Sequence, residues 1–138
     1  MGEKQRQHWY IATLVIACKV KGGSDDDDPT CDEQIRLIRA PNAEIAYEKA
    51  RQIGKHEELA YENIYGQTVR WAFVGLDDLD ELDNTIHDGV EIRSRLFGHR
   101  SPLSLVRAKA DLSVFAGENN PYPAEYRIKT ENIPARDE

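Results

Sequence analysis

Residues 9–20, WYIATLVIACKV, decide the fold because they predict a long β-strand that is apolar on both of its faces. β-Branched and aromatic residues are enriched in strands, and this stretch is rich in both. Alternate side chains of a strand point to opposite faces, and both alternating sets here are mostly apolar. Such a strand lies inside a sheet and needs cover on each side. One helix covers one face, so we expect a second layer, the C-terminal segment or another subunit on the other.

The residues that follow predict the return strand of a hairpin and then one amphipathic helix. The loop KGGSDDDDPT leads into residues 31–39, whose apolar and polar side chains alternate. Asn42 is a good N-cap, and apolar residues recur from there at helical spacing until Gly54, which marks the last turn or the position after it. We expect this main helix to pack on one face of the sheet.

A second hairpin is expected over residues 60–76, with Gly66 supplying the positive backbone angle of the turn. Strict alternation places Phe73 and Leu76 on opposite faces of its second strand, which we expect beside the first strand. Residues 90–97 follow an Asp-Gly turn signal and predict a fifth strand. The fold class is therefore α+β, with an antiparallel sheet of about five strands in the order β-β-α-β-β-β.

The remaining segments are less regular. Acidic residues 77–83 suggest a helical or turn segment whose leucines face the core, and residues 102–112 predict a short helix after a Ser-Pro start. Three apolar or aromatic side chains could dock the tail on the body or on a neighbouring subunit: Tyr122, Tyr126 and Ile128. The expected division is an N-terminal tail at 1–8, an α+β core domain at 9–98 and a C-terminal extension at 99–138.

Composition and charge exclude several classes of protein. The chain has 138 residues, enough for one domain with a buried core. Its net charge of −7 repels phosphate groups, so nucleic acid is not an expected partner. No apolar run approaches the ~20 residues that cross a bilayer, and MGEKQRQ does not begin a signal peptide, so we expect a cytoplasmic protein without a membrane partner. Cys18 and Cys31 should then stay reduced.

Charge is segregated along the second half of the chain. Residues 75–91 contain seven acids and no Lys or Arg, whereas residues 92–110 contain five bases, together with His99, and no acid. Arginine binds phosphate and carboxylate through two hydrogen bonds, so the basic segment is a candidate site for a small anionic ligand. The favoured alternative is that both segments are solvated or pair with each other, within the molecule or across a dimer. The bases are Arg93, Arg95, Arg100, Arg107 and Lys109.

No motif predicts a catalytic residue or a metal site. The four histidines lack the spacing of zinc ligands, and no serine lies in a nucleophile-elbow context. Cys18 lies inside an apolar strand, where a thiol is inert. No cofactor is predicted either, although a haem held by one His or Tyr leaves no spacing signature and stays an alternative.

Four pieces of the sequence share one family likeness. They are Trp9-Tyr10 at the start of the first strand, the Tyr-x-Asn-x-Tyr-Gly turn at 61–66, the Val-x-Trp-x-Phe-Val-Gly strand at 69–75, and DGVEIRSRLF at 88–97. Together they resemble the bacterial family catalogued as domain of unknown function 4288, over roughly residues 9–97. Gln67 stands where that family commonly has Glu. The resemblance implies a bacterial source and a compact α+β domain, and it brings no activity and no site residues.

Three functional hypotheses remain open. The leading one is a non-enzymatic binding or oligomerising module that forms a homodimer, because two strands need cover on both faces. The first alternative is a protein that binds a small ligand or cofactor in a pocket lined by Trp9, Tyr61, Asn63 and Trp71. The second is an enzyme that acts on an anionic substrate and requires the convergence of Arg93, Arg95 and His99.

Overall fold

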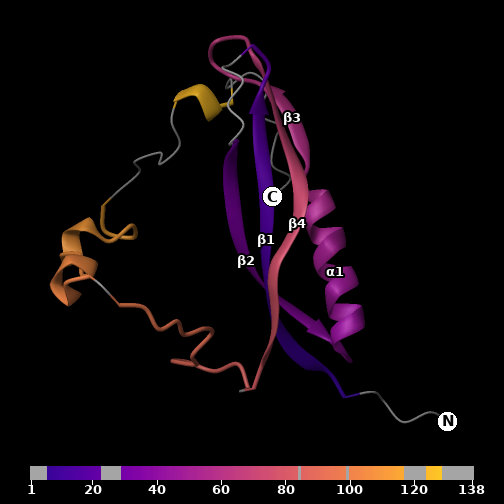
Figure 1. The fold of residues 1–138 in the computed structure, drawn as a ribbon, viewed down its shortest axis with the longest axis vertical. Coiled ribbons are helices and arrows are strands. Elements are labelled where there is room, and N and C mark those ends of the chain that lie inside the picture. Colours follow the sequence, from indigo (N-terminus) through magenta and orange to yellow (C-terminus); the bar gives the residue numbers. More distant parts are fainter. Residues whose placement is uncertain (1–5, 23–28, 84, 99, 117–123, 129–138) are drawn as a thin grey trace.

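The computed structural model describes residues 6–22, 29–83, 85–98, 100–116 and 124–128 of the chain. These residues form one antiparallel sheet, with one α-helix on one side of it and a long C-terminal segment on the other (Figure 1). The strands are β1 (His8–Val20), β2 (Thr30–Ala40), β3 (Leu59–Glu62) and β4 (Thr68–Leu82), in the spatial order β2-β1-β4-β3. The α+β class and the antiparallel sheet are confirmed, and the sheet has four strands instead of about five.

β1 is the central strand that its two-sided apolar sequence predicts. It pairs with β2 at eleven positions and with β4 at twelve. Side chains on both of its faces are buried, Leu14 on one and Thr13 on the other. Because β1 is bonded along both edges and covered on both faces over much of its length, it organises the whole sheet.

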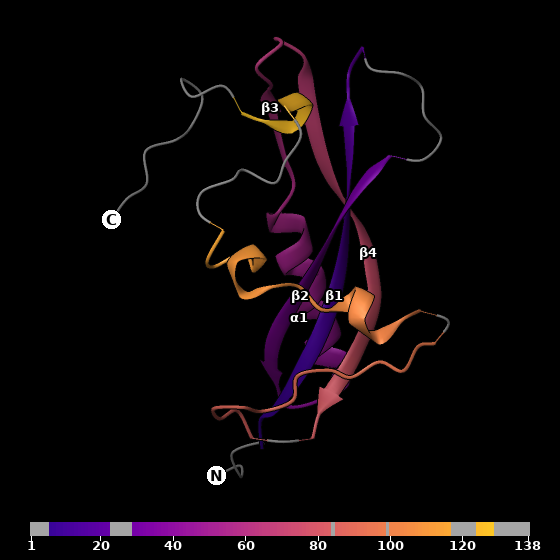
Figure 2. The same cartoon turned by 90° about the vertical axis from the view of Figure 1, so that its left-hand side faces the viewer.

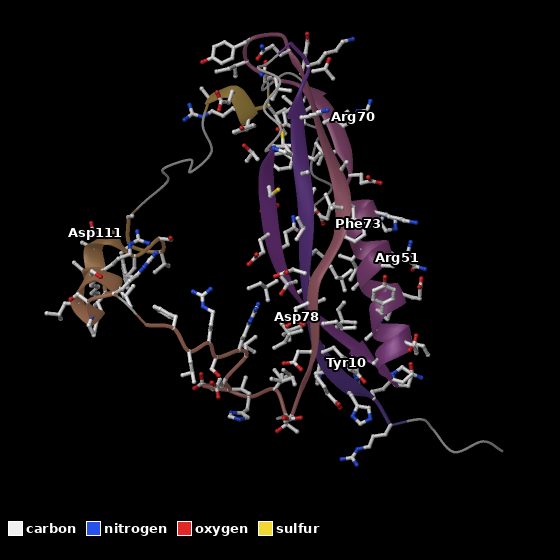
Figure 3. All side chains as sticks on the ribbon, viewed as in Figure 1. Tyr10, Arg51, Arg70, Phe73, Asp78 and Asp111 are labelled. Carbon is white, nitrogen blue, oxygen red and sulfur yellow. The ribbon has the colours of Figure 1, made fainter. Side chains whose placement is uncertain are left out.

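The helix α1 (Ala43–His56) packs against one face of the sheet. Its N-cap is Asn42, as the sequence predicts, and the Asn42 Oδ1 accepts a hydrogen bond of 2.9 Å from the Ile45 amide. Gly54 lies in the last turn of α1, where the ring of Phe73 fills the space that a side chain would need. Figure 3 shows Phe73 on β4 beside α1. Small residues on the helix thus let it approach the larger side chains of the strands. The buried core comprises Tyr10, Ala12, Leu14, Ile38, Ala40, Ala46 and Ala50.

β4 carries two irregularities that correct two expectations from the sequence. Val74 and Asp77 have no partner on β1, because the register shifts by one residue at each of them. Each extra residue reverses the alternation, so Phe73 and Leu76 both pack toward the core under α1 instead of lying on opposite faces. The acidic stretch 77–83 is not helical, since β4 continues to Leu82. Pairing there satisfies the backbone groups of the first half of β1.

We call residues 85–98 and 100–116 the arm. The expected fifth strand at 90–97 is wrong, because these residues run as irregular chain on the side of the sheet away from α1 (Figures 1 and 2). Residues 90–97 find no free edge on the central strand, because both edges of β1 already pair, one with β2 and the other with β4. The expected helix at 102–112 is also wrong, with two 3₁₀ turns at Pro102–Leu105 and Lys109–Asp111 in its place. Both turns are exposed, and a short helix with no apolar surface to pack on is unstable.

None of the helices in the described ranges combines the length and the apolar character needed to cross a bilayer.

Candidate functional site

The end of the sheet where β3 turns into β4 brings together three of the residues singled out from the sequence: Tyr61, Asn63 and Trp71. The turn between the strands contains Gly66, whose φ of 79° confirms its predicted role. The indole Nε1 of Trp71 donates a hydrogen bond of 3.0 Å to the Tyr61 hydroxyl. We call these three residues, together with Thr30 at the start of β2, the docking cluster.

Asn63 is the fully buried polar residue of the docking cluster, and both ends of its amide are used. Its Oδ1 accepts hydrogen bonds from the backbone N–H groups of Tyr65 at 3.0 Å and Gln67 at 2.9 Å, which fixes the turn. Its Nδ2 donates to the Gln67 Oε1 and to the main-chain carbonyl of Glu125, each at 2.9 Å. Asn63 therefore ties the turn to a segment that is remote in the sequence.

That remote partner is residues 124–128, which we call the tail segment and which begins with the 3₁₀ turn Ala124–Tyr126. Figure 2 shows this turn beside the β3 end of the sheet. The Tyr61 hydroxyl donates to the main-chain carbonyl of Tyr126 at 2.7 Å. The Tyr126 ring packs on Trp71, with centroids 6.1 Å apart and planes at 58°.

Two more contacts complete the docking of the tail segment. The Tyr126 hydroxyl and the Thr30 Oγ1 share a hydrogen bond of 2.5 Å. Ile128 pairs with Asn63 in an antiparallel bridge. The expectation that Tyr126 docks the tail is confirmed, with this chain's own body as the surface. Ile128 contributes its backbone while its side chain is 37% exposed, and Tyr122 lies outside the described residues.

Trp9 does not join the docking cluster. It lies opposite Leu82 at the start of β1, whereas Trp71 lies opposite Cys18 near the end of that strand. The guanidinium of Arg39 lies over the Trp9 ring, 5.9 Å from its centroid. The four residues expected to line one ligand pocket thus lie at two ends of the sheet.

A half-open cleft of about 360 Å³ lies where the start of the arm crosses β1 and β4 on the face away from α1. Arg93 reaches across it and donates from Nη1 to the Thr13 Oγ1 at 3.2 Å. Five carboxylates around one guanidinium favour a cation in this cleft over an anion. The acids are Asp78, Asp80, Glu81, Asp83 and Glu91.

Two of the three residues proposed for an anionic substrate, Arg93 and Arg95, have different surroundings. Arg93 lines the acidic cleft, whereas the guanidinium of Arg95 lies over the Phe97 ring, 5.1 Å from its centroid. His99 lies outside the described residues. Over the parts of the chain that the structure describes, no group of three or more His, Cys, Asp or Glu side chains is placed to hold a metal ion.

Cys18 and Cys31 are both free thiols, and they lie on opposite faces of the sheet. Cys18 lies opposite Thr30 and Cys31 opposite Ala17, so the two side chains alternate in direction. Cys18 is buried, and burial raises the pKa of its thiol to about 11, whereas Cys31 is exposed.

We expect a disulfide reagent to modify one cysteine of the native chain quickly at neutral pH and the second only on unfolding. The thiolate is the reactive form, and a pKa of about 11 keeps the Cys18 thiol protonated at neutral pH. Absorbance of the released thiol measures the reaction. Cys31→Ser should abolish the fast phase, and Cys18→Ser should leave it intact. Equal reaction rates for the two native thiols would contradict this assignment.

Comparison with known proteins places the sheet and the helix in one family. Residues 9–94 match a family model described as Domain of unknown function (DUF4288). The match contains Tyr61, Asn63 and Trp71 and ends within the arm, so the tail segment lies outside it. No curated protein and no solved structure matches the chain.

Proposed function

Given that the chain belongs to the DUF4288 family, whose description carries no activity, we propose that it is a non-enzymatic binding and oligomerising module that forms a homodimer in a bacterial cytoplasm. The observation that carries this proposal is the apolar surface exposed by two parts of the molecule. One part is the second sheet face, which is turned away from α1, and the other is the arm.

The second sheet face exposes apolar side chains on β2. Ile35 and Leu37 lie there opposite Thr13 and Ile11 of β1, and Leu37 is 45% exposed. The next residue along β2, Ile38, points the other way into the core beneath α1. The start of the arm covers Thr13 and Ile11 on this face, so the apolar strip on β2 beside them is the part that a partner would cover.

The arm exposes still larger apolar side chains. Leu96 is fully exposed and Leu103 is 85% exposed, and Phe97, Val106 and Phe115 are exposed as well. Soluble monomers rarely leave contiguous apolar patches above a few hundred Å² in water, because burying such surface contributes roughly 25 cal/mol per Å². An arm of this composition is suited to lie on another apolar surface.

A second copy of the same chain supplies that surface with matching charge. The second sheet face is flanked by the carboxylates Asp78 and Asp80, and the arm carries Arg95, Arg100 and Lys109. In a two-fold dimer the rest of each arm, residues 95–98 and 100–116, lies on the second sheet face of the partner. The two-fold axis repeats the contact, so apolar side chains meet apolar side chains and bases meet acids at two equivalent places. A stable interface of this kind buries about 800 Å² on each subunit.

The dimer is tested by one pair of substitutions matched for exposure. We expect the wild-type chain to have twice the 15.7 kDa chain mass by light scattering at micromolar concentration. Leu37→Asp places a charge on the second sheet face and should give a monomer. Ile45→Asp changes a residue of similar exposure, 42%, on the outer side of α1 and should leave the dimer intact.

Circular dichroism of both variants should match the wild type, which separates lost assembly from lost folding. A wild-type chain that is monomeric at tens of micromolar would refute the dimer. Equal dissociation by both variants would refute the assignment of the second sheet face. The ligand-binding and anionic-substrate alternatives have weaker support, because Tyr126 packs on Trp71 and carboxylates surround Arg93.

A further inference from the structure

The contacts between the docking cluster and the tail segment resemble those between a protein and a bound peptide. Two side chains of the cluster donate to two successive main-chain carbonyls, Asn63 to Glu125 and Tyr61 to Tyr126. Ile128 then adds a backbone bridge beside Asn63. Main-chain hydrogen bonds of this kind hold a peptide whatever its side chains are.

One side chain of the tail segment supplies the specificity. The Tyr126 ring packs on Trp71, and its hydroxyl reaches the Thr30 Oγ1. An aromatic ring combines a large apolar area with a polar end, and this site has a partner for each. These contacts use the Tyr126 side chain and the main-chain carbonyls of Glu125 and Tyr126.

The donors of the docking cluster are oriented by the body of the protein. Trp71 donates to the Tyr61 hydroxyl oxygen, so the hydroxyl proton is directed to the carbonyl of Tyr126. The Asn63 amide is held by the backbone N–H groups of Tyr65 and Gln67, so its Nδ2 is aimed at the carbonyl of Glu125. Oriented donors lose little freedom when a ligand binds, which favours affinity.

We propose that the docking cluster is a peptide-binding site, and that the tail segment is the ligand that this chain supplies to it. The ligand class is a short peptide with a tyrosine anchor, whose backbone two positions later pairs beside Asn63. This site lies at the end of the sheet, apart from Leu37 and the second sheet face, so it adds a binding activity to the proposed dimer.

The test supplies the tail as a separate peptide to the full-length chain. Tyr126→Ala removes the anchor side chain, and Trp9→Phe leaves Trp71 as the single tryptophan. We expect Trp71 emission to shift to the red in this variant and to return when the peptide PAEYRIKT, residues 123–130, is added. The same peptide carrying a fluorophore gives the affinity by anisotropy.

The chain with its own tail should bind the peptide at least about tenfold more weakly, since a tethered segment competes at roughly millimolar effective concentration. Tyr65→Ala is the control, because Tyr65 is an exposed tyrosine in the adjacent turn and its loss should leave the docked tail and the weak binding unchanged. A peptide in which alanine replaces the tyrosine should not bind.

Three results would overturn the proposal. One is an unchanged Trp71 emission in the tail variant, which would mean that the tail does not cover the site. Another is a red-shifted emission without peptide binding at millimolar concentration. The third is equal binding to the tail variant and to the wild type. The mass of the dimer is measured independently, so failure here leaves the proposed assembly untouched.

Discussion

Asn63→Ala is expected to lower the free energy of unfolding by about 3 kcal/mol, since each buried polar group left without a partner costs on the order of 1–3 kcal/mol. The change removes four hydrogen bonds from a fully buried position. The backbone N–H groups of Tyr65 and Gln67 lose their acceptor, and the Glu125 carbonyl loses its donor. Urea denaturation followed by circular dichroism measures the effect.

Asn63→Asp separates the two roles of this residue. An aspartate keeps an oxygen for the Tyr65 and Gln67 amides, so the turn should persist. Its second oxygen would face the Glu125 carbonyl, which has no proton to give, so the contact with the tail segment should be lost. We expect a smaller loss of stability than for alanine together with a red shift of Trp71 emission. Equal stability loss in the two variants would show that the turn bonds contribute little.

Gly54→Ala is expected to destabilise the protein, although alanine is the best helix former. A Cβ at Gly54 would lie 2.3 Å from Cδ1 and Cε1 of Phe73 and 2.8 Å from Cγ. Overpacking lowers the free energy of unfolding by about 1–3 kcal/mol, and the better helix propensity of alanine raises it by about 1 kcal/mol. Because this contact is very close, we expect a net decrease of about 2 kcal/mol. For a chain of 138 residues Tm falls by roughly 4 °C per kcal/mol, so we expect a fall in Tm of about 8 °C by thermal denaturation.

Phe73→Leu tests the cause of that loss. A leucine side chain lacks the rigid ring and its Cε1, and its Cδ atoms can rotate away from the new Cβ. The double variant should therefore recover part of the loss predicted from the two single changes. Gln52→Ala, at an exposed position of the same helix, should change stability by less than about 0.5 kcal/mol. Strictly additive effects of Gly54→Ala and Phe73→Leu would refute the close approach of α1 to β4.

Local patterns were sufficient for the elements whose signals are short in range. The apolar stretch of β1, the Asn42 cap and the Gly66 turn each depend on residues within a few positions, and all three are present. Local sequence could not predict where β4 ends, because its last residues include several Asp and Asp is depleted in strands. The strand continues through Asp80 because the neighbouring edge of β1 needs hydrogen-bond partners, and that edge lies about seventy residues earlier.

The residues of the candidate site also differ in whether local sequence could predict them. Tyr61, Asn63 and Trp71 come from one hairpin, so their grouping follows from the predicted turn. Trp9 lies on β1, the same strand that pairs with Trp71, but at its opposite end. The alternation of side chains predicts the face on which a residue lies and does not predict the end of the sheet. Tyr126 lies in a segment outside the strands, which meets the turn after β3 through the bridge of Ile128 to Asn63. Sequence periodicity does not predict such a contact.

The pairing of β1 with β4 also sets the order in which the protein can assemble during synthesis. β1 and β2 are made first and can form a hairpin, and α1 can close over it. Trp9 pairs with Leu82, so the other edge of β1 stays open until the ribosome has released nearly the whole of β4. An apolar strand with an open edge is prone to aggregate, and closing such long-range pairs is slow. We therefore expect nascent chains that stop before β4 to need chaperones, and chains that extend past it to fold without them.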